Sequence, residues 1–171
     1  MIYKCMAILL GMALVLLTLP GCVGYQLGST LPPDVKAIYV QLFINKCNEP
    51  LLEIDTTNAT IAEFQKDGTL RIVPKGEADV LLETTLNGMT LTPLRYDQTI
   101  DKNKPNEYRL TLNVSFVLKR AKTKEIMNEA SVVGESTFTF IGNLNSSKRA
   151  AIPQASEDLA KRIVEKVVET W

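Results

Sequence analysis

The feature that most constrains the fold is a strict alternation of side-chain character along residues 108–120. Every second position is apolar, in the order Tyr108, Leu110, Leu112, Val114, Phe116 and Leu118. The positions between them are mostly polar, which predicts a β-strand with one buried face and one face in water. Residues 121–125 are expected to form a turn, and residues 126–140 to return as the antiparallel partner. A hairpin of this kind needs a second layer to cover its apolar face.

Two helices are expected to supply this layer. The first is predicted over residues 50–67, with Asn48 or Glu49 as its cap, Pro50 in its first turn and Gly68 at its end. Its buried stripe is predicted to contain the apolar residues Leu51, Ile54, Ile61, Ala62 and Phe64.

The second helix is expected to follow Pro153, with Ser156 as its cap and with Glu157 and Asp158 in its first turn. A polar loop over residues 143–147 should precede it. Six residues form one apolar stripe along this helix: Ala160, Ile163, Val164, Val167, Val168 and Trp171. The opposite side mixes acidic and basic residues, which favours packing on the sheet over a position on an anionic membrane surface.

Further strands are predicted over residues 37–44, 69–73 and 78–92, the last with a bend near Asn87 and Gly88. Residues 93–107 are rich in charged and amide side chains and are expected to form a long exposed loop. This order of strands and helices predicts an α+β fold of two layers.

The N-terminus predicts export. Lys4 precedes an apolar run over residues 7–19, which is shorter than the roughly 20 residues of a membrane-spanning helix, so a removable signal peptide fits better. The motif Leu19-Pro20-Gly21-Cys22 resembles the bacterial lipobox, in which the cysteine is acylated. The alternative is an uncut anchor helix, which Pro20 and Gly21 disfavour.

We therefore expect lipidation of Cys22 and a chain of three parts. These parts are a signal peptide over residues 1–21, a lipidated tether over residues 22–35 and one α+β domain over residues 36–171. A domain of this length is long enough to bury a core of its own.

Composition excludes several classes of function. Loss of Lys4 from the 19 basic residues leaves 18 against 19 acidic ones, and nucleic-acid binding needs a net basic surface. The absence of histidine excludes Ser-His and Cys-His nucleophiles and histidine-ligated metals. No phosphate-cradling glycine loop, nucleophile elbow or CxxC pair occurs. We expect no catalytic residue, no metal site, no cofactor and no nucleic-acid partner.

Two groups of residues remain as candidates for binding. Positive charges gather at the predicted hairpin turn: Lys119, Arg120, Lys122 and Lys124. They either keep the turn solvated or bind anionic groups such as phosphates. Lys148 and Arg149 form a smaller pair with the same two interpretations.

The second group is the polar face of the hairpin strand, formed by Arg109, Thr111, Asn113 and Ser115. These side chains either face solvent or suit insertion into a wet, polar cavity, such as the lumen of a large outer-membrane barrel. The residues alone leave both interpretations open.

Several segments taken in order resemble the LptE family of lipopolysaccharide-assembly lipoproteins. They are Gly24-Tyr25-Gln26-Leu27-Gly28 after Cys22, Ile38-Tyr39-Val40 with Phe43 and Asn45, Glu49-Pro50-Leu51, Glu63-Phe64, Ala78-Asp79-Val80-Leu81, Tyr108-Arg109-Leu110-Thr111-Leu112 and Val167-Val168-Glu169-Thr170-Trp171. The resemblance extends over essentially the whole chain after the signal peptide.

The resemblance implies a fold, a partner and a place in the cell. Members of this family have two helices packed on one face of a mostly four-stranded mixed sheet. They lie in the outer membrane inside the LptD β-barrel, help that barrel to assemble, and help to deliver lipopolysaccharide, which they contact through basic residues. Val23 is not the aspartate that typically retains lipoproteins in the inner membrane, so the outer membrane is the expected destination.

No motif transfers a lipopolysaccharide-binding residue from the family to this chain. Lys119, Arg120, Lys122 and Lys124 are therefore proposed as such a site from charge density alone. Two alternative functions remain: a lipid-anchored periplasmic adaptor that activates a cell-wall synthase, and a lipid-anchored hydrolase, which the missing histidine disfavours.

Overall fold

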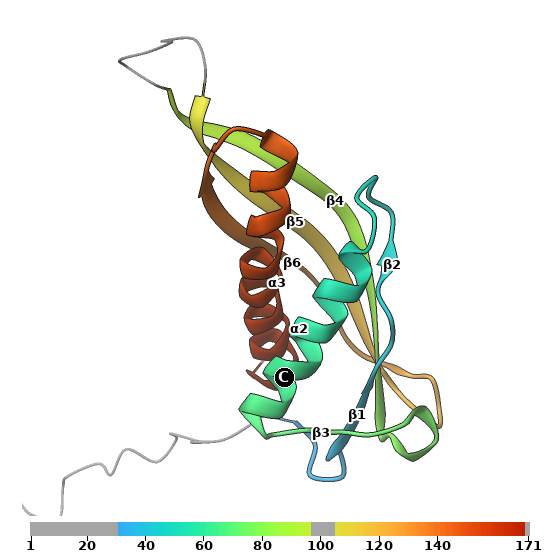
Figure 1. Ribbon diagram of the computed structural model, residues 1–171. Coiled ribbons are helices and arrows are strands. Elements are labelled where there is room, and N and C mark those ends of the chain that lie inside the picture. The colour runs from blue at the N-terminus through green and yellow to red at the C-terminus, as the bar shows by residue number, and fades with distance from the viewer. Residues whose placement is uncertain (1–30, 97–104, 170–171) are drawn as a thin grey trace, which may run out of the picture.

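A six-stranded sheet carries two helices on one of its faces in the computed structural model, which describes residues 31–96 and 105–169 (Figure 1). The strands are β1 (Ala37–Val40), β2 (Ile44–Asn45), β3 (Arg71–Ile72), β4 (Val80–Tyr96), β5 (Pro105–Arg120) and β6 (Ile126–Thr139). The helices are α2 (Leu52–Asp67), the 3-10 turn η1 (Lys75–Glu77) and α3 (Leu144–Glu169). No helix in the described ranges is long and apolar enough to span a membrane.

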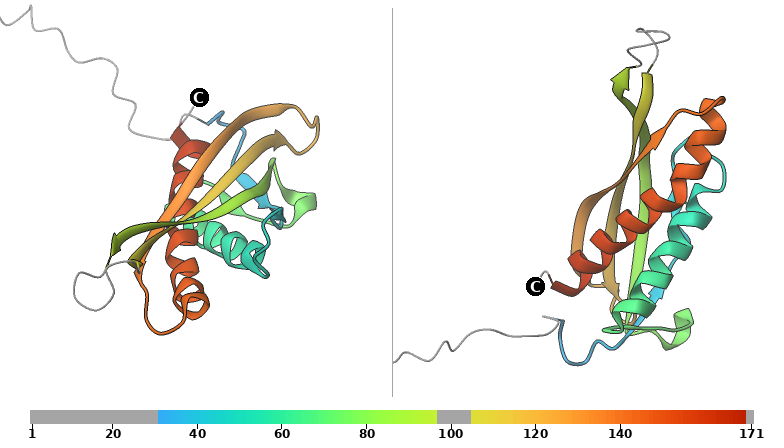
Figure 2. Two further views of the ribbon diagram at one scale, coloured as in Figure 1. Left: turned by 90° about the horizontal axis from the view of Figure 1, so that it is seen from above. Right: turned by 60° about the vertical axis from the view of Figure 1, so that its left-hand side comes forward.

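The sheet is mixed, as expected. Its strands follow the order β3-β1-β4-β5-β6, and β2 also pairs with β4. Strand β1 pairs in parallel with β3 and β4, and β2 pairs in parallel with β4, whereas β4, β5 and β6 form an antiparallel meander. The prediction of a two-layer α+β fold with both helices on one face is confirmed (Figure 2). The sheet has six strands rather than four because the two-residue strands β2 and β3 also pair with it.

The alternation in residues 108–120 produces the predicted two-faced strand. The side chains of β5 that face the helices are at most 1% exposed: Leu110, Leu112, Val114, Phe116 and Leu118. Strand β6 returns beside β5 in antiparallel register, with Val114 opposite Val132. This face of the hairpin forms one apolar core with α3.

The predicted loop over residues 93–107 is wrong at both ends. Strand β4 continues to Tyr96, and β5 already begins at Pro105, because backbone pairing extends beyond the apolar core to residues with polar side chains. Residues 97–104 lie outside the described part of the chain. A bulge between Leu86 and Gly88 lies at the place where the bend was predicted.

Helix α2 ends as predicted but begins differently. Gly68 adopts a positive φ of 75° and donates its backbone N–H to the carbonyl of Phe64. At the other end the cap is Leu51, with a φ of 68° and no capping side chain, so neither Asn48 nor Glu49 caps the helix. The Glu49 side chain instead turns into the protein and binds Lys148.

The buried stripe of α2 also differs from the prediction. Leu51 and Ile54 are exposed, and the buried residues are Leu52, Thr56, Thr57, Thr60 and Phe64. The three threonines can be buried because each hydroxyl donates to the carbonyl four residues earlier, at distances of 2.8, 2.6 and 2.8 Å. Phe64 is buried as predicted and Ile61 packs partly buried against the core, so apolarity alone identified only part of the buried stripe.

Helix α3 is 13 residues longer at its N-terminus than the predicted cap at Ser156 implies, since it begins at Leu144 and contains Pro153. The Asn143 side chain accepts the backbone N–H groups of Asn145 and Ser146, so it caps the first turn. Ser156 is instead buried inside the helix. The apolar stripe is confirmed for Ala160, Ile163, Val164, Val167 and Val168, and Trp171 lies outside the described residues.

Candidate functional site

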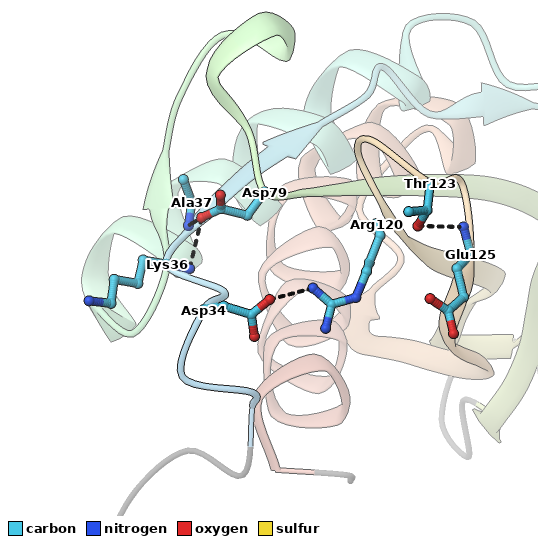
Figure 3. Close-up of polar contacts among 7 residues, drawn as sticks. All are labelled: Asp34, Lys36, Ala37, Asp79, Arg120, Thr123 and Glu125. Carbon is cyan, nitrogen blue, oxygen red and sulfur yellow. Dashed lines mark hydrogen bonds and ion pairs between the residues drawn. The ribbon is translucent and has the colours of Figure 1, made fainter.

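One end of the molecule joins the start of the described chain to the β5–β6 turn. Arg120 Nη1 lies 2.5 Å from Asp34 Oδ2, although the two residues are 86 positions apart in the sequence (Figure 3). Asp79 Oδ2 accepts the backbone N–H groups of Lys36 at 3.0 Å and Ala37 at 2.9 Å. These contacts hold the segment that precedes β1 beside the turn.

The Asp34–Arg120 pair joins an exposed carboxylate to a half-buried guanidinium. The hydrogen bond from Arg120 holds the pKa of the Asp34 carboxyl below its ordinary value. The same contact raises the pKa of Arg120. Both side chains therefore keep their charges at physiological pH, and the positive charge of Arg120 is balanced locally.

The four basic residues of the turn divide into two kinds. Lys119 Nζ lies 2.6 Å from Glu83 Oε2, and Arg120 pairs with Asp34. Lys122 and Lys124 are exposed and have no ion-pair partner in the described ranges. The structure thus brings all four residues to one end of the molecule but leaves only two lysines with unpaired positive charge.

The two residues of the smaller basic pair, Lys148 and Arg149, also lie in different environments. Lys148 Nζ lies 2.5 Å from Glu49 Oε2, and both side chains are largely buried, whereas Arg149 is exposed. Lys148 is therefore a structural residue that fastens α3 to the segment before α2. The sequence carried no signal for this contact, because its partners are 99 positions apart.

The polar face predicted on β5 exists and extends over the neighbouring strands. Small polar side chains from three strands line up across the sheet, since Ser115 on β5 pairs with Thr85 on β4 and with Ser131 on β6. Arg109 lies 3.8 Å from Glu135, so its charge is balanced within the same face. The side of the sheet opposite the helices is therefore mostly hydrophilic, with Ile44, Val117 and Val133 as apolar residues among the polar ones, and it has few long unpaired charges.

Potential metal ligands do not cluster in residues 31–96 and 105–169. No three side chains of the types Cys, Asp and Glu gather there in a metal-binding arrangement. Cys22, the predicted lipidation site, lies outside the described residues. The mostly hydrophilic sheet face and the two lysines of the turn are the features on which the proposed function rests.

A protein-family model for lipopolysaccharide assembly, LptE, matches residues 35–167. The chain belongs to the LptE family. The match covers most of both layers, from the start of β1 to the last turns of α3. Membership assigns the chain to lipopolysaccharide assembly, which agrees with the expectation of a non-catalytic protein. No curated protein matches the sequence.

Solved structures share the fold at low sequence identity. A minor lipoprotein from Acinetobacter baumannii is 11% identical, with 78% of this chain and 92% of that chain covered at a TM-score of 0.50. A protein from Xanthomonas campestris is 10% identical, with coverage of 80% and 88% and a TM-score of 0.53. A hypothetical protein from Chlamydia trachomatis is 7% identical, with coverage of 78% and 95% and a TM-score of 0.56.

Proposed function

We propose that this chain is an outer-membrane lipoprotein, acylated at Cys22 after removal of residues 1–21, that plugs the LptD barrel and helps it to assemble and to deliver lipopolysaccharide. Membership of the LptE family supports a role in lipopolysaccharide assembly. The outer face of the sheet supports the role of a plug. The lumen of a large outer-membrane barrel is polar and wet. A protein lodged there needs a hydrophilic surface, which the strand positions around Thr85, Ser115 and Ser131 provide.

The division of the molecule into two faces carries this proposal. The helices already cover the apolar face, so the core is complete without a partner. The opposite face offers hydroxyl and amide groups, such as the hydrogen-bonded side chains of Asn87 and Ser115, at 3.0 Å. Such groups can replace hydrogen bonds to bulk water by direct or water-mediated hydrogen bonds to the barrel lining at little cost in free energy.

Lipopolysaccharide contact is proposed at the β5–β6 turn. Lys122 and Lys124 supply the free positive charge, while Lys119 and Arg120 stabilise the turn through Glu83 and Asp34. A lipid on Cys22 would keep the same end close to the membrane, because Asp34 follows Cys22 by only 12 positions. At about 3.6 Å per residue they span about 43 Å at most.

Purification from outer membranes tests the role of a plug. The acylated protein extracted in mild detergent is expected to bring with it a large β-barrel that mass spectrometry identifies as LptD. The Cys22→Ala variant, which has no acylation site, is the matched control and is expected to yield much less of the complex. Recovery of the acylated protein alone, or together with a cell-wall synthase, would contradict the proposal.

The turn is tested by replacing both free lysines with serine. The Lys122→Ser/Lys124→Ser variant is expected to bind lipopolysaccharide about thirtyfold more weakly, because each lysine near an anionic surface contributes about 1 kcal/mol. Fluorescence anisotropy with labelled lipopolysaccharide measures the affinity. The control is Lys161→Ser/Lys166→Ser, which removes two exposed charges from α3. Equal losses in the two variants would mean that net charge, rather than the turn, determines binding.

A further inference from the structure

Strand β6 is an edge strand, and half of its backbone groups point away from the sheet. The N–H of Phe140 donates to Asn106 on the β5 side, whereas the N–H of Glu135 points outward and donates to Asp158. Because backbone direction alternates along a strand, the odd-numbered residues of β6 from Glu129 onward direct both N–H and C=O away from β5. An edge of this kind is a template for pairing with another strand.

Helix α3 closes part of this edge and leaves another part open. The carboxylate of Asp158 accepts the backbone N–H of Glu135 at 2.9 Å. The side-chain amide of Asn128 donates to the carbonyl of Lys166, which holds the far end of α3 against β6. Beyond Glu135 the outward backbone groups of Thr137 and Thr139 have no partner among the described residues, and both residues are exposed. The open stretch lies near the end of the sheet where α3 begins (Figure 1).

A groove runs beside this open stretch of strand. It has a volume of about 340 Å³ and lies between the end of β6 and the first turns of α3. Small or apolar side chains line much of it: Phe138, Ile141, Ser147, Ala150 and Ala151. Ile141 is 77% exposed, and no charged side chain lines the groove. A strand edge with an apolar groove next to it is the arrangement by which peptides bind through strand addition.

We propose that this groove binds a short, extended, uncharged segment of the barrel partner, which pairs with the backbone of Thr137 and Thr139 and inserts an apolar side chain toward Ala150. The length of the open edge favours this occupant over a second copy of the chain. Asp158 stops pairing at Glu135, so two complete β6 strands cannot align along their lengths. The inference rests on the proposed function, because the partner supplies the segment.

Site-specific cross-linking in cells tests the inference. A photoreactive residue replaces Gln154, which is exposed and lines the groove. The acylated full chain is expected to form an adduct with one short segment of LptD, identified by mass spectrometry. In the Thr139→Pro variant this adduct is expected to fall at least tenfold. Proline removes the outward N–H but no bond to β5, so the strand itself tolerates it.

Three further variants test whether the loss of the adduct arises from the groove and the backbone N–H of Thr139. Glu129→Pro also removes an outward N–H from β6, but far from the groove, and is expected to leave the adduct unchanged. Thr139→Val keeps the N–H and removes only the hydroxyl, with the same expectation. Ala150→Leu fills the groove without altering the backbone and is expected to reduce the adduct, so that the test also holds if Thr139→Pro folds poorly.

The outcomes separate the two proposals. Copurification of LptD without an adduct at position 154 overturns strand addition and leaves the role of a plug standing. An adduct with a second copy or with lipid overturns it as well, and so does an adduct that Thr139→Pro and Ala150→Leu do not change. Absence of LptD from both experiments overturns the proposed function and, with it, the inference.

Discussion

Replacement of Lys148 by methionine is expected to lower the free energy of unfolding by about 3–5 kcal/mol, because it leaves a charged partner buried and alone. The partner is Glu49, whose side chain is 8% exposed and lies 2.5 Å from Lys148 Nζ. Methionine fills nearly the same volume, so the loss arises from the unpaired carboxylate rather than from a cavity. Urea denaturation of the domain, followed by circular dichroism, measures the change.

Two controls separate this burial effect from a general effect of charge. Lys66→Met removes an exposed ion pair with Glu63, in which the lysine side chain is 70% exposed, and should cost less than about 1 kcal/mol. The double variant Glu49→Leu/Lys148→Met removes both charges and should recover most of the stability. If Lys148→Met were no worse than Lys66→Met, the contact between Glu49 and Lys148 would contribute nothing to the fold.

The second large effect is expected at Gly134, where α3 packs against β6. A Cβ atom at this position would lie 2.4 Å from the Leu159 Cβ and 2.6 Å from the carbonyl oxygen of Ala155. Both atoms are close to or part of the helix backbone, so relief requires α3 to move. Gly134→Ala is therefore expected to destabilise the protein by about 3 kcal/mol, at the upper end of the cost of overpacking.

Gly88→Ala is the matched control, since it adds the same methyl group to β4 in the same sheet. Nothing lies within 4 Å of a Cβ at this position. The substitution should leave stability unchanged or raise it by up to about 1 kcal/mol through reduced freedom of the unfolded chain. Similar unfolding midpoints for the two variants would show that α3 does not approach β6 as closely as described.

Some patterns predicted local structure correctly and others did not. The alternation along β5 and the stripe from Ala160 to Val168 predicted which side of each element is buried, because one face of a strand or helix met one core. The start of α3 was missed because Pro153 and Ser156 resemble a helix start, yet tertiary contacts carry the helix through them. One such contact is the hydrogen bond from Ser136 to the carbonyl of Ala151.

The candidate sites were likewise predicted in part and missed in part. Charge density placed four basic residues at one turn, and the structure confirms that they lie together at that end of the molecule. It also pairs two of them with Glu83 and Asp34, which lie 36 and 86 positions away in the sequence. The groove beside β6 had no signal in the sequence, because Thr139 and Ala150 acquire their roles only when α3 folds back along the strand edge.

The order of residues was enough to predict the two layers, the antiparallel hairpin and the family, since periodicity and the order of segments are properties of the chain alone. Which charges remain free, which backbone edge stays open and which threonines are buried became known only from the folded molecule. These properties depend on contacts between residues that are distant along the chain, such as Glu49 and Lys148. A pattern of neighbouring residues cannot specify such contacts, because they exist only after the chain has folded.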